Sequence, residues 1–185
     1  LNTIDYLDED DRHITWPTLI GFSFTVKCWG EVKADGLVPI EFNTEAFDQL
    51  VLPKERKEML LSLVERHSER ENRKTLDVIS TKGNGVIFLF HGPSGSGKTV
   101  TCEPIAELLK VPLYVVALGE LGVTPRELEE SLIEIMELCE LWNAIILLDE
   151  ADIFVEKRSK GEIGRNAMVG ILLRLLEGMN NIVFL

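Results

Sequence analysis

The stretch that most constrains the fold of this chain is the octapeptide GPSGSGKT at residues 92–99. It follows the apolar run Val86–Phe90 after a single residue, and that run predicts a buried strand. The octapeptide also opens a segment with the pattern of a helix. Its glycines let the backbone turn its N–H groups inward around a phosphate, and a helix beginning at the loop directs its positive end toward the same anion. A strand, a turn of this composition and a helix in this order predict a phosphate-binding loop.

The residue types of this loop predict a role for each part of it. Lys98 can reach the β- and γ-phosphate oxygens as a point charge, and Thr99 offers a hydroxyl to Mg²⁺. We therefore predict that Lys98 takes part in catalysis and that Thr99 is a metal ligand. The segment is a Walker A motif, and its predicted nucleotide-binding residues are Gly92, Pro93, Ser94, Gly95, Ser96, Gly97, Lys98, Thr99 and Val100.

Beyond residue 75, strand and helix patterns alternate along the chain. Near-continuous aliphatic runs predict parallel strands that are buried on both faces, and the amphipathic stretches between them predict covering helices. The predicted strands are residues 86–90, 113–118, 144–148 and 182–185, and the predicted helices are residues 98–110, 125–142 and 165–177. We predict an α/β fold with a doubly wound parallel sheet, of the P-loop NTPase class.

The helix predicted at residues 125–142 carries its own start signal. Thr124 precedes Pro125 and Glu127 in the order expected of an N-cap, a first helical residue and a capping box. One apolar stripe of this helix is expected to face the core, and its members are Leu128, Leu132, Ile135, Leu138 and Leu141.

A second motif with the chemistry of a phosphate site is IILLDE at residues 145–150, a Walker B pattern. Because the carboxyl ends of parallel strands line the ligand crevice, Asp149 and Glu150 are expected beside the phosphate loop. Asp149 is the candidate for holding Mg²⁺ opposite Thr99, and Glu150 is the candidate for orienting and polarising the attacking water. Taken alone, the motif could also be a strand that ends in acidic turn residues. Together with the loop it predicts phosphoryl transfer, in which catalysis is largely positioning and charge neutralisation.

The amino-terminal part of the chain has a different pattern. Alternating apolar and polar residues between 19 and 42 predict short antiparallel strands, and the amphipathic segment after Pro53 predicts a helix. We therefore divide the chain into a β-rich region at residues 1–53, a connecting helix at residues 54–74 and a nucleotide-binding core at residues 75–185.

Composition argues against several classes of partner and site. The 185 residues carry a formal net charge of −12, which disfavours a nucleic-acid groove built from clustered Lys and Arg. The three cysteines and three histidines show no ligand spacing, so neither a disulfide framework nor a zinc site is predicted. No apolar run reaches the ~18 residues of a membrane span, and no signal peptide is visible. These features predict an intracellular, cytoplasmic protein with no nucleic-acid partner.

Residues 149–152 spell DEAD, the signature of a family of RNA helicases, so that class has to be weighed. In those helicases the interval between GKT and DEAD is longer than it is here, where 50 residues separate Thr99 from Asp149 (149 − 99 = 50). They also need a basic and aromatic surface for the strand, which this acidic chain lacks. The shorter interval, with one strand between two helices, resembles the core of the AAA ATPases.

The resemblance to the AAA family covers about residues 75–185. Within the family, the whole chain resembles the large, mostly uncharacterised fungal AAA ATPases, through Trp29 and the segments 45–53, 91–93, 142–144 and 156–159. The resemblance implies ATP and Mg²⁺ as nucleotide and cofactor, hydrolysis of ATP, a homo-oligomeric and usually hexameric ring, and a protein partner that is remodelled. A nucleotide-binding scaffold that does not hydrolyse ATP is the remaining alternative.

The same resemblance implies parts that would lie beyond Leu185. AAA ATPases place a polar sensor residue, arginine fingers, a fifth strand and a helical lid there, and they order their strands 5-1-4-3-2. Residues 86–90 are therefore expected at an exposed sheet edge, and the chain as given is expected to be prone to aggregate and weak or inactive in hydrolysis. The family's aromatic gripping triplet has no counterpart in LGELGV at residues 118–123.

Overall fold

The computed structural model describes residues 16–73, 85–92, 95–151 and 163–185. Its contacts divide the chain into two compact units, residues 1–41 and 42–185. The predicted loop residues Pro93 and Ser94 lie outside the described residues.

The first unit contains an antiparallel hairpin of β1 (Thr18–Ser23) and β2 (Cys28–Lys33), followed by the short helix η2 (Ala34–Gly36). Phe22 lies opposite Trp29 in the register of the hairpin, and their rings make an edge-to-face contact at 5.5 Å. The prediction of antiparallel strands is confirmed here. It is wrong for residues 37–41, which form no strand, and Pro39 among them has no N–H to donate to a neighbouring strand.

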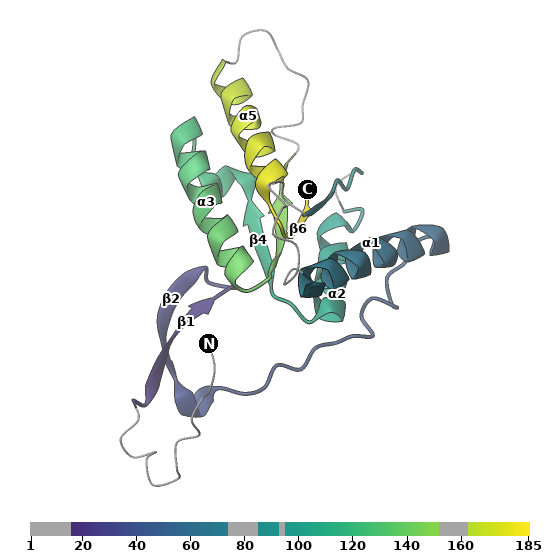
Figure 1. Cartoon of the computed structure of the whole chain (residues 1–185), viewed down its shortest axis with the longest axis vertical. Coiled ribbons are helices and arrows are strands. Elements are labelled where there is room, and N and C mark those ends of the chain that lie inside the picture. Colours follow the sequence, from purple (N-terminus) through teal and green to yellow (C-terminus); the bar gives the residue numbers. More distant parts are fainter. Residues whose placement is uncertain (1–15, 74–84, 93–94, 152–162) are drawn as a thin grey trace. The chain divides into compact units, whose positions relative to one another are not determined.

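The second unit is built on a four-stranded parallel sheet (Figure 1). Its strands are β3 (Val86–Phe88), β4 (Leu113–Ala117), β5 (Ile145–Asp149) and β6 (Ile182–Phe184). Their order across the sheet is β3-β6-β5-β4, and every pairing is parallel. The predicted α/β fold with a parallel sheet is therefore confirmed, and so is the strand order that the family resemblance implies for these four strands.

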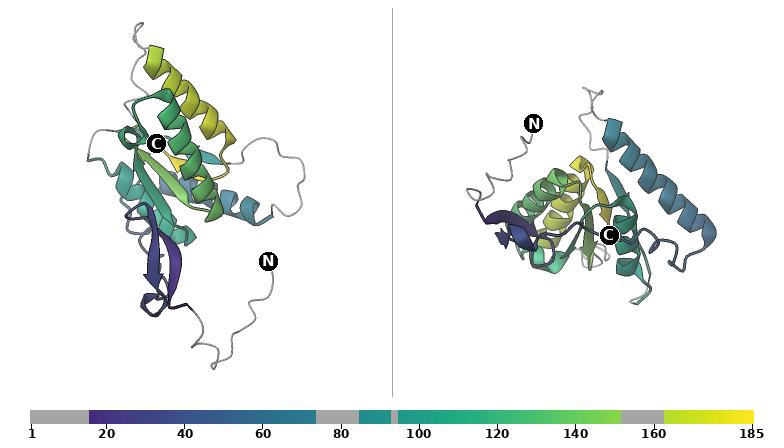
Figure 2. Two further views of the ribbon diagram at one scale, coloured as in Figure 1. Left: turned by 90° about the vertical axis from the view of Figure 1, so that its left-hand side faces the viewer. Right: turned by 90° about the horizontal axis from the view of Figure 1, so that it is seen from below.

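Helices cover both faces of this sheet, as the views in Figures 1 and 2 show. The four longer helices are α1 (Lys54–Arg73), α2 (Lys98–Leu109), α3 (Pro125–Leu141) and α5 (Ile163–Gly178), and a short helix η3 (Leu118–Leu121) follows β4. Helices α1 and α2 lie on one face, and α3 and α5 lie together on the other. The predicted helix bounds differ from these by only one or two residues, because the apolar periodicity of each helix is unambiguous.

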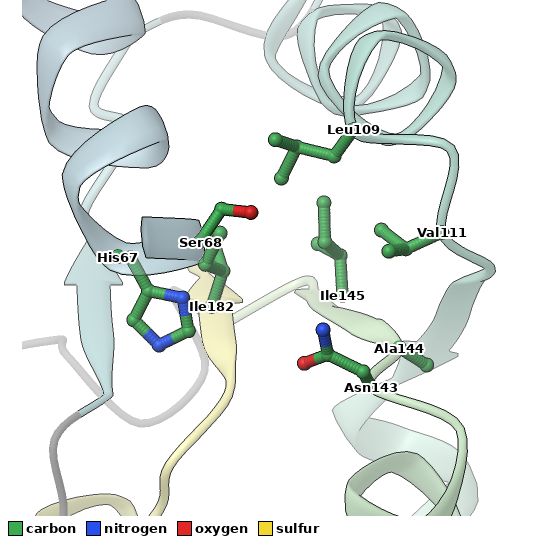
Figure 3. A pocket seen from close by; sticks show the side chains of 8 residues that line it. All are labelled: His67, Ser68, Leu109, Val111, Asn143, Ala144, Ile145 and Ile182. Atoms are coloured by element: carbon green, nitrogen blue, oxygen red, sulfur yellow. The ribbon is translucent and has the colours of Figure 1, made fainter. Parts of the chain in front are cut away.

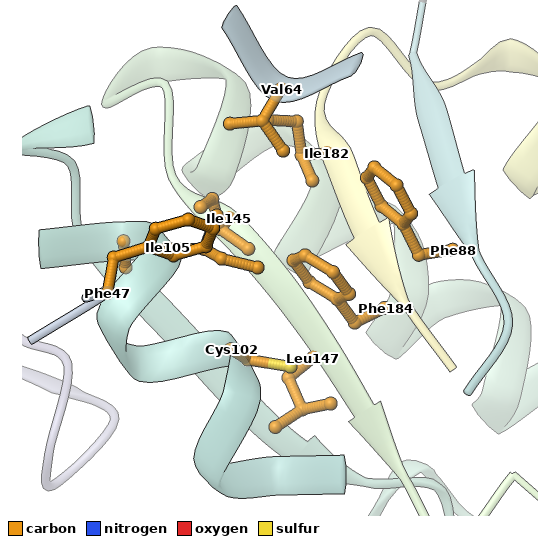
Figure 4. Packing of buried hydrophobic residues seen from close by; sticks show 10 residues of the cluster. Phe47, Val64, Phe88, Cys102, Ile105, Ile145, Leu147, Ile182 and Phe184 are labelled. Carbon is orange, nitrogen blue, oxygen red and sulfur yellow. The ribbon is translucent and has the colours of Figure 1, made fainter. Parts of the chain in front are cut away.

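The core under α1 and α2 is an aromatic and aliphatic cluster (Figure 4). The rings of Phe88 and Phe184 stack with their centroids 4.9 Å apart, and Phe184 is fully buried. Val64 of α1 and Ile105 of α2 pack over the same strands. The cluster ties the connecting helix to the sheet.

The boundary between the compact units lies nearer the amino terminus than the domain boundary that we predicted at residue 53. Phe47 is 4% exposed and belongs to the cluster under α1 and α2. The backbone N–H of Asn43 donates to the carboxylate of Glu107 on α2 at 2.7 Å. Residues 42–53 therefore pack with the second unit, because an apolar anchor and a long-range hydrogen bond hold them on α2.

One predicted core residue of α3 is exposed. Leu141 has 70% of its surface exposed, whereas Cys139 is fully buried. Residues 128, 132, 135 and 139 follow spacings of four, three and four, which keep them on one face of a helix with 3.6 residues per turn. Leu141 falls outside this stripe at the last residue of the helix, so its predicted place in the core is wrong.

Candidate functional site

The phosphate-loop sequence lies between the carboxyl end of β3 and the start of α2. Gly95 and Gly97 have φ angles of 77° and 84°, in the left-handed region that a side chain disfavours. At Gly92 the restriction is steric, since an added Cβ would lie 2.9 Å from Ser96 Oγ. The backbone path of the loop therefore favours glycine at 95 and 97, and a side chain at 92 would require Ser96 to move.

The Lys98 side chain turns back across this loop. Its Nζ donates a hydrogen bond of 2.7 Å to the carbonyl oxygen of Gly92, at the beginning of the motif. A positive charge is thereby held over the turn whose backbone amides would surround an anion. A phosphate oxygen could take the place of the Gly92 carbonyl oxygen in this contact, since each of these oxygens accepts hydrogen bonds.

The two predicted motifs meet at a hydrogen bond between side chains. Thr99, in the first turn of α2, donates from Oγ1 to Asp149 Oδ2 at 3.2 Å, although the two residues are 50 positions apart. Asp149 is the last residue of β5 and is half-buried. The parallel sheet therefore brings the Walker A hydroxyl and the Walker B carboxylate into direct contact.

Glu150 follows Asp149 in an unusual backbone conformation. Its φ angle is 59°, which is uncommon for a residue with a Cβ, and such residues occur preferentially at functional sites. Its backbone N–H donates to Asp149 Oδ1 at 2.9 Å, so both carboxylate oxygens of Asp149 accept hydrogen bonds. The Glu150 residue is exposed, which leaves its carboxylate accessible to water or a ligand.

Two residues behind the loop were not predicted from sequence. Thr101 donates to the carbonyl of Gly97 twice, from its backbone N at 3.0 Å and from Oγ1 at 2.7 Å. Cys102 is fully buried, and burial, followed by the negative charge of Asp149, raises its pKa to about 12. The sequence signal that could have indicated the role of Thr101 was its position four residues after Gly97, from which a helical threonine can bond the glycine carbonyl.

Comparison with known families agrees with this geometry. The family model described as "ATPase family associated with various cellular activities (AAA)" matches residues 88–185, which is more than half of the chain. The chain belongs to the AAA family. The matched region contains the loop at residues 92–99 as well as Asp149 and Glu150.

Curated relatives of the AAA chain include bacterial Clp subunits. The "ATP-dependent Clp protease ATP-binding subunit ClpX 2" of Wolinella succinogenes is 28% identical over an alignment of 144 residues that covers 71% of this chain and 36% of the relative. The corresponding ClpX subunit of Treponema denticola is 28% identical over an alignment of 163 residues that covers 80% of this chain and 39% of the relative. The AAA chain thus spans well under half the length of these relatives.

The oxygen donors of the AAA site suit a magnesium ion. Mg²⁺ prefers oxygen ligands and is usually bound by one or two protein groups together with waters and substrate phosphates. Thr99 Oγ1 and Asp149 Oδ2 provide such a pair, 3.2 Å apart. Among the residues that the structure describes, no three His, Cys, Asp or Glu side chains gather as a group for another kind of metal site.

A second polar region lies at the opposite, amino ends of the AAA strands. A small cavity there, with room for about one water molecule, is shown in Figure 3. Its lining residues are His67, Ser68, Leu109, Val111, Asn143, Ala144, Ile145 and Ile182. The cavity is too small for a nucleotide, so the candidate site stays at the carboxyl ends of the strands.

The helices that the structure describes include no candidate for a membrane span. None of them is both long enough and apolar enough to cross a bilayer.

Proposed function

We propose that this AAA domain binds ATP on the Walker A loop, hydrolyses it with Mg²⁺, and drives the remodelling of a protein partner. Membership of an ATPase family supports an ATP-dependent activity, and the two bacterial relatives are named ATP-binding subunits of an ATP-dependent protease. The observation that carries the proposal is the Thr99–Asp149 hydrogen bond, because it joins the two halves of the proposed site.

In this proposal the loop at residues 92–99 holds the phosphates. Left-handed glycines leave backbone N–H groups free of side-chain cover, and Lys98 exchanges its Gly92 acceptor for phosphate oxygens. Val100, 63% exposed in the first turn of α2, belongs to the same binding segment. The helix adds the positive end of its dipole to the loop.

Thr99 and Asp149 are the residues proposed to hold the cofactor ion. The hydroxyl of Thr99 would offer a lone pair to the metal, and it donates its proton to Asp149 Oδ2. When bound, Mg²⁺ neutralises charge on the phosphate oxygens. Asp149 stays anchored through its other oxygen, which accepts from the Glu150 backbone.

Glu150 is proposed to be the catalytic carboxylate. It accepts a proton from the attacking water and orients that water in line with the leaving group, as phosphoryl transfer requires. The hydrogen bond from the Glu150 backbone N–H to Asp149 Oδ1 fixes the Glu150 backbone relative to Asp149, the proposed metal ligand. Lys98 acts with it by stabilising the charge on the transferred group.

Other parts of the proposal rest on family membership. A homo-oligomeric ring, usually a hexamer, and a protein substrate are expected of the whole protein, as are kinship with the large fungal AAA ATPases and a cytoplasmic location. The loop at residues 118–123 is not the proposed gripping element, because it has no aromatic residue and because Leu118 and Leu121 are buried in η3.

Two substitutions in the full-length protein test the assigned roles. Glu150→Gln should keep ATP affinity within about twofold but reduce turnover at least 100-fold, since it removes the proton acceptor and retains the shape. Lys98→Ala should weaken ATP binding at least 100-fold, because a charged partner of the phosphates is lost. Binding of a fluorescent ATP analogue and release of phosphate measure the two effects separately.

Glu137→Gln, on the exposed surface of α3, is the matched control and should change neither quantity. Unchanged turnover in Glu150→Gln would remove the assigned base, and tight ATP binding by Lys98→Ala would exclude the loop as the site. ATP binding without any phosphate release by the assembled protein would identify a non-hydrolysing scaffold. Turnover that rises only with added RNA or DNA would favour a helicase.

A further inference from the structure

The carbonyl oxygen of Gly97 accepts two hydrogen bonds, both from Thr101. It accepts the backbone N–H of Thr101 at 3.0 Å, which is an ordinary helical bond. It also accepts the hydroxyl of the same residue at 2.7 Å. Thr101 is half-buried under the loop and lies outside the Walker A octapeptide.

The orientation of this carbonyl determines the direction of a neighbouring amide. A trans peptide unit is planar, so the C=O of Gly97 and the N–H of Lys98 point in opposite directions from one rigid plane. The carbonyl is drawn along α2 toward Thr101. The Lys98 N–H is therefore directed back, toward the space that the loop surrounds.

Gly97 is the position at which such a restraint has the most effect. Its φ angle is 84°, and it has no side chain that could pack against a neighbour and restrain it. Glycine also has the largest backbone freedom of any residue. A second donor on its carbonyl narrows the range of orientations that the peptide between Gly97 and Lys98 can sample.

We infer that Thr101 is a positioning residue for phosphate binding, which acts by fixing the Gly97–Lys98 peptide so that the Lys98 amide points at the phosphate. The inference rests on the proposed ATP site at residues 92–99. Thr101 touches the backbone of the loop and acts on the ligand only through it. Hydroxyl bonds to a preceding carbonyl are common in helices. This one differs because its acceptor is a left-handed glycine at the phosphate site.

The test compares Thr101→Val with Thr101→Ser in the full-length protein. Valine keeps the branched shape but loses the donor, and it should weaken ADP and ATP binding by roughly 3- to 10-fold, the range of a single net hydrogen bond. Serine keeps the donor and should stay within about twofold of the original protein. Thr101→Ala, which also lacks the hydroxyl, should behave as valine does and replaces it if valine impairs folding.

A control and a spectroscopic readout separate positioning from general stability. Ser62 makes a similar bond in α1, from Oγ to Met59 O at 2.8 Å, so Ser62→Ala should leave nucleotide affinity unchanged. The amide ¹⁵N resonance of Lys98 should shift on addition of ADP in the original protein. That shift should be reduced in Thr101→Val and restored in Thr101→Ser.

The outcomes distinguish this inference from the proposed function. Equal affinity of Thr101→Val and the original protein, or equal losses in the valine and serine variants, would overturn the role of the hydroxyl. If Lys98→Ala loses nucleotide binding in the same assay, the ATP site stands and only the inference fails. If Lys98→Ala binds normally, the proposed site itself is wrong.

Discussion

The two ends of the parallel sheet differ in how deeply their polar side chains are buried. At the carboxyl edge, the polar side chains that the structure describes, those of Ser96, Lys98, Thr99, Asp149 and Glu150, are half-buried or exposed. Three described residues there have left-handed φ angles. At the amino edge, Asn181 and His67 are each 5% exposed. Both are hydrogen-bonded to backbone carbonyls.

The bonds at the amino edge are internal to the fold. Asn181 Nδ2 donates to Cys139 O at 3.1 Å and to Ala144 O at 3.0 Å, and so ties the approach to β6 to the end of α3 and the start of β5. His67 Nε2 donates to Asn180 O at 2.6 Å and ties α1 to the same turn. The carboxyl edge instead places its donors and carboxylates where an anion and a metal can reach them. Left-handed residues other than glycine occur at both ends, Glu150 at the carboxyl edge and Lys110 and Asn143 at the amino edge, so the two edges differ in the burial of polar groups and not in backbone strain.

The largest expected effect on stability is at the amino edge. Asn181→Ala leaves two buried carbonyls without this donor and should lower the free energy of unfolding by about 2–3 kcal/mol. Urea denaturation measures the loss, and nucleotide affinity of the folded fraction should be unchanged. Asn180→Ala, which loses a bond to Glu140 at an exposed position, is the control and should cost below about 1 kcal/mol. Equal losses in the two variants would contradict the structural role of Asn181.

A smaller effect on stability, with a loss of binding, is expected at the carboxyl edge. Gly97→Ala meets no clash but forces a residue with a Cβ to a φ angle of 84°, which should cost about 1–2 kcal/mol and weaken ATP binding. Gly119→Ala is the control, since Gly119 has neither a close contact nor a left-handed φ angle, and it should be neutral or slightly stabilising. Nucleotide binding that survives Gly97→Ala intact would end the contrast between the two edges.

A still smaller, pH-dependent effect is expected from a carboxylate that serves structure at the carboxyl edge. Glu127 accepts from the backbone N–H groups of Val123 and Thr124, and these bonds lower its pKa below the ordinary value of 4.5. Because the folded pKa is depressed, its contribution is fully present above pH 4.5 and is lost as the pH falls through the folded value. The stability difference between the original protein and Glu127→Gln should therefore shrink on acidification, as thermal unfolding from pH 7 to pH 3 would show. A difference that grows on acidification would contradict this assignment.

No difference between the two edges is expected in thiol reactivity. Cys102 and Cys139 are both fully buried, and burial is the main cause that raises the pKa of each to about 12. Cys28 is exposed on the hairpin. Iodoacetamide at pH 8 should modify Cys28 and spare the other two, as peptide mass mapping would show. Labelling of Cys102 at the rate of Cys28 would mean that the loop opens readily to solvent.

Local patterns were sufficient to predict most elements of the second unit. The strands follow aliphatic runs, and the start of α3 follows from Thr124, Pro125 and Glu127, whose predicted capping box is present. The prediction for Leu141 was wrong because the buried stripe of α3 ends at Cys139, and Leu141, at the last residue of the helix, lies outside that stripe. Residues 42–53 were grouped with the β-rich region, whereas their contacts place them in the second compact unit, and no local pattern shows that Phe47 packs into the core cluster.

The residue types of the site could be identified from the local pattern alone, because the glycines, Lys98, Thr99 and the paired acids have a chemistry that few other patterns share. The direct contact between Thr99 and Asp149 became visible only in the folded chain, since it depends on strand order across the sheet and not on spacing along the chain. The same holds for Thr101. A threonine in a helix is unremarkable until the peptide that its hydroxyl holds is known to belong to a left-handed glycine beside the proposed phosphate site.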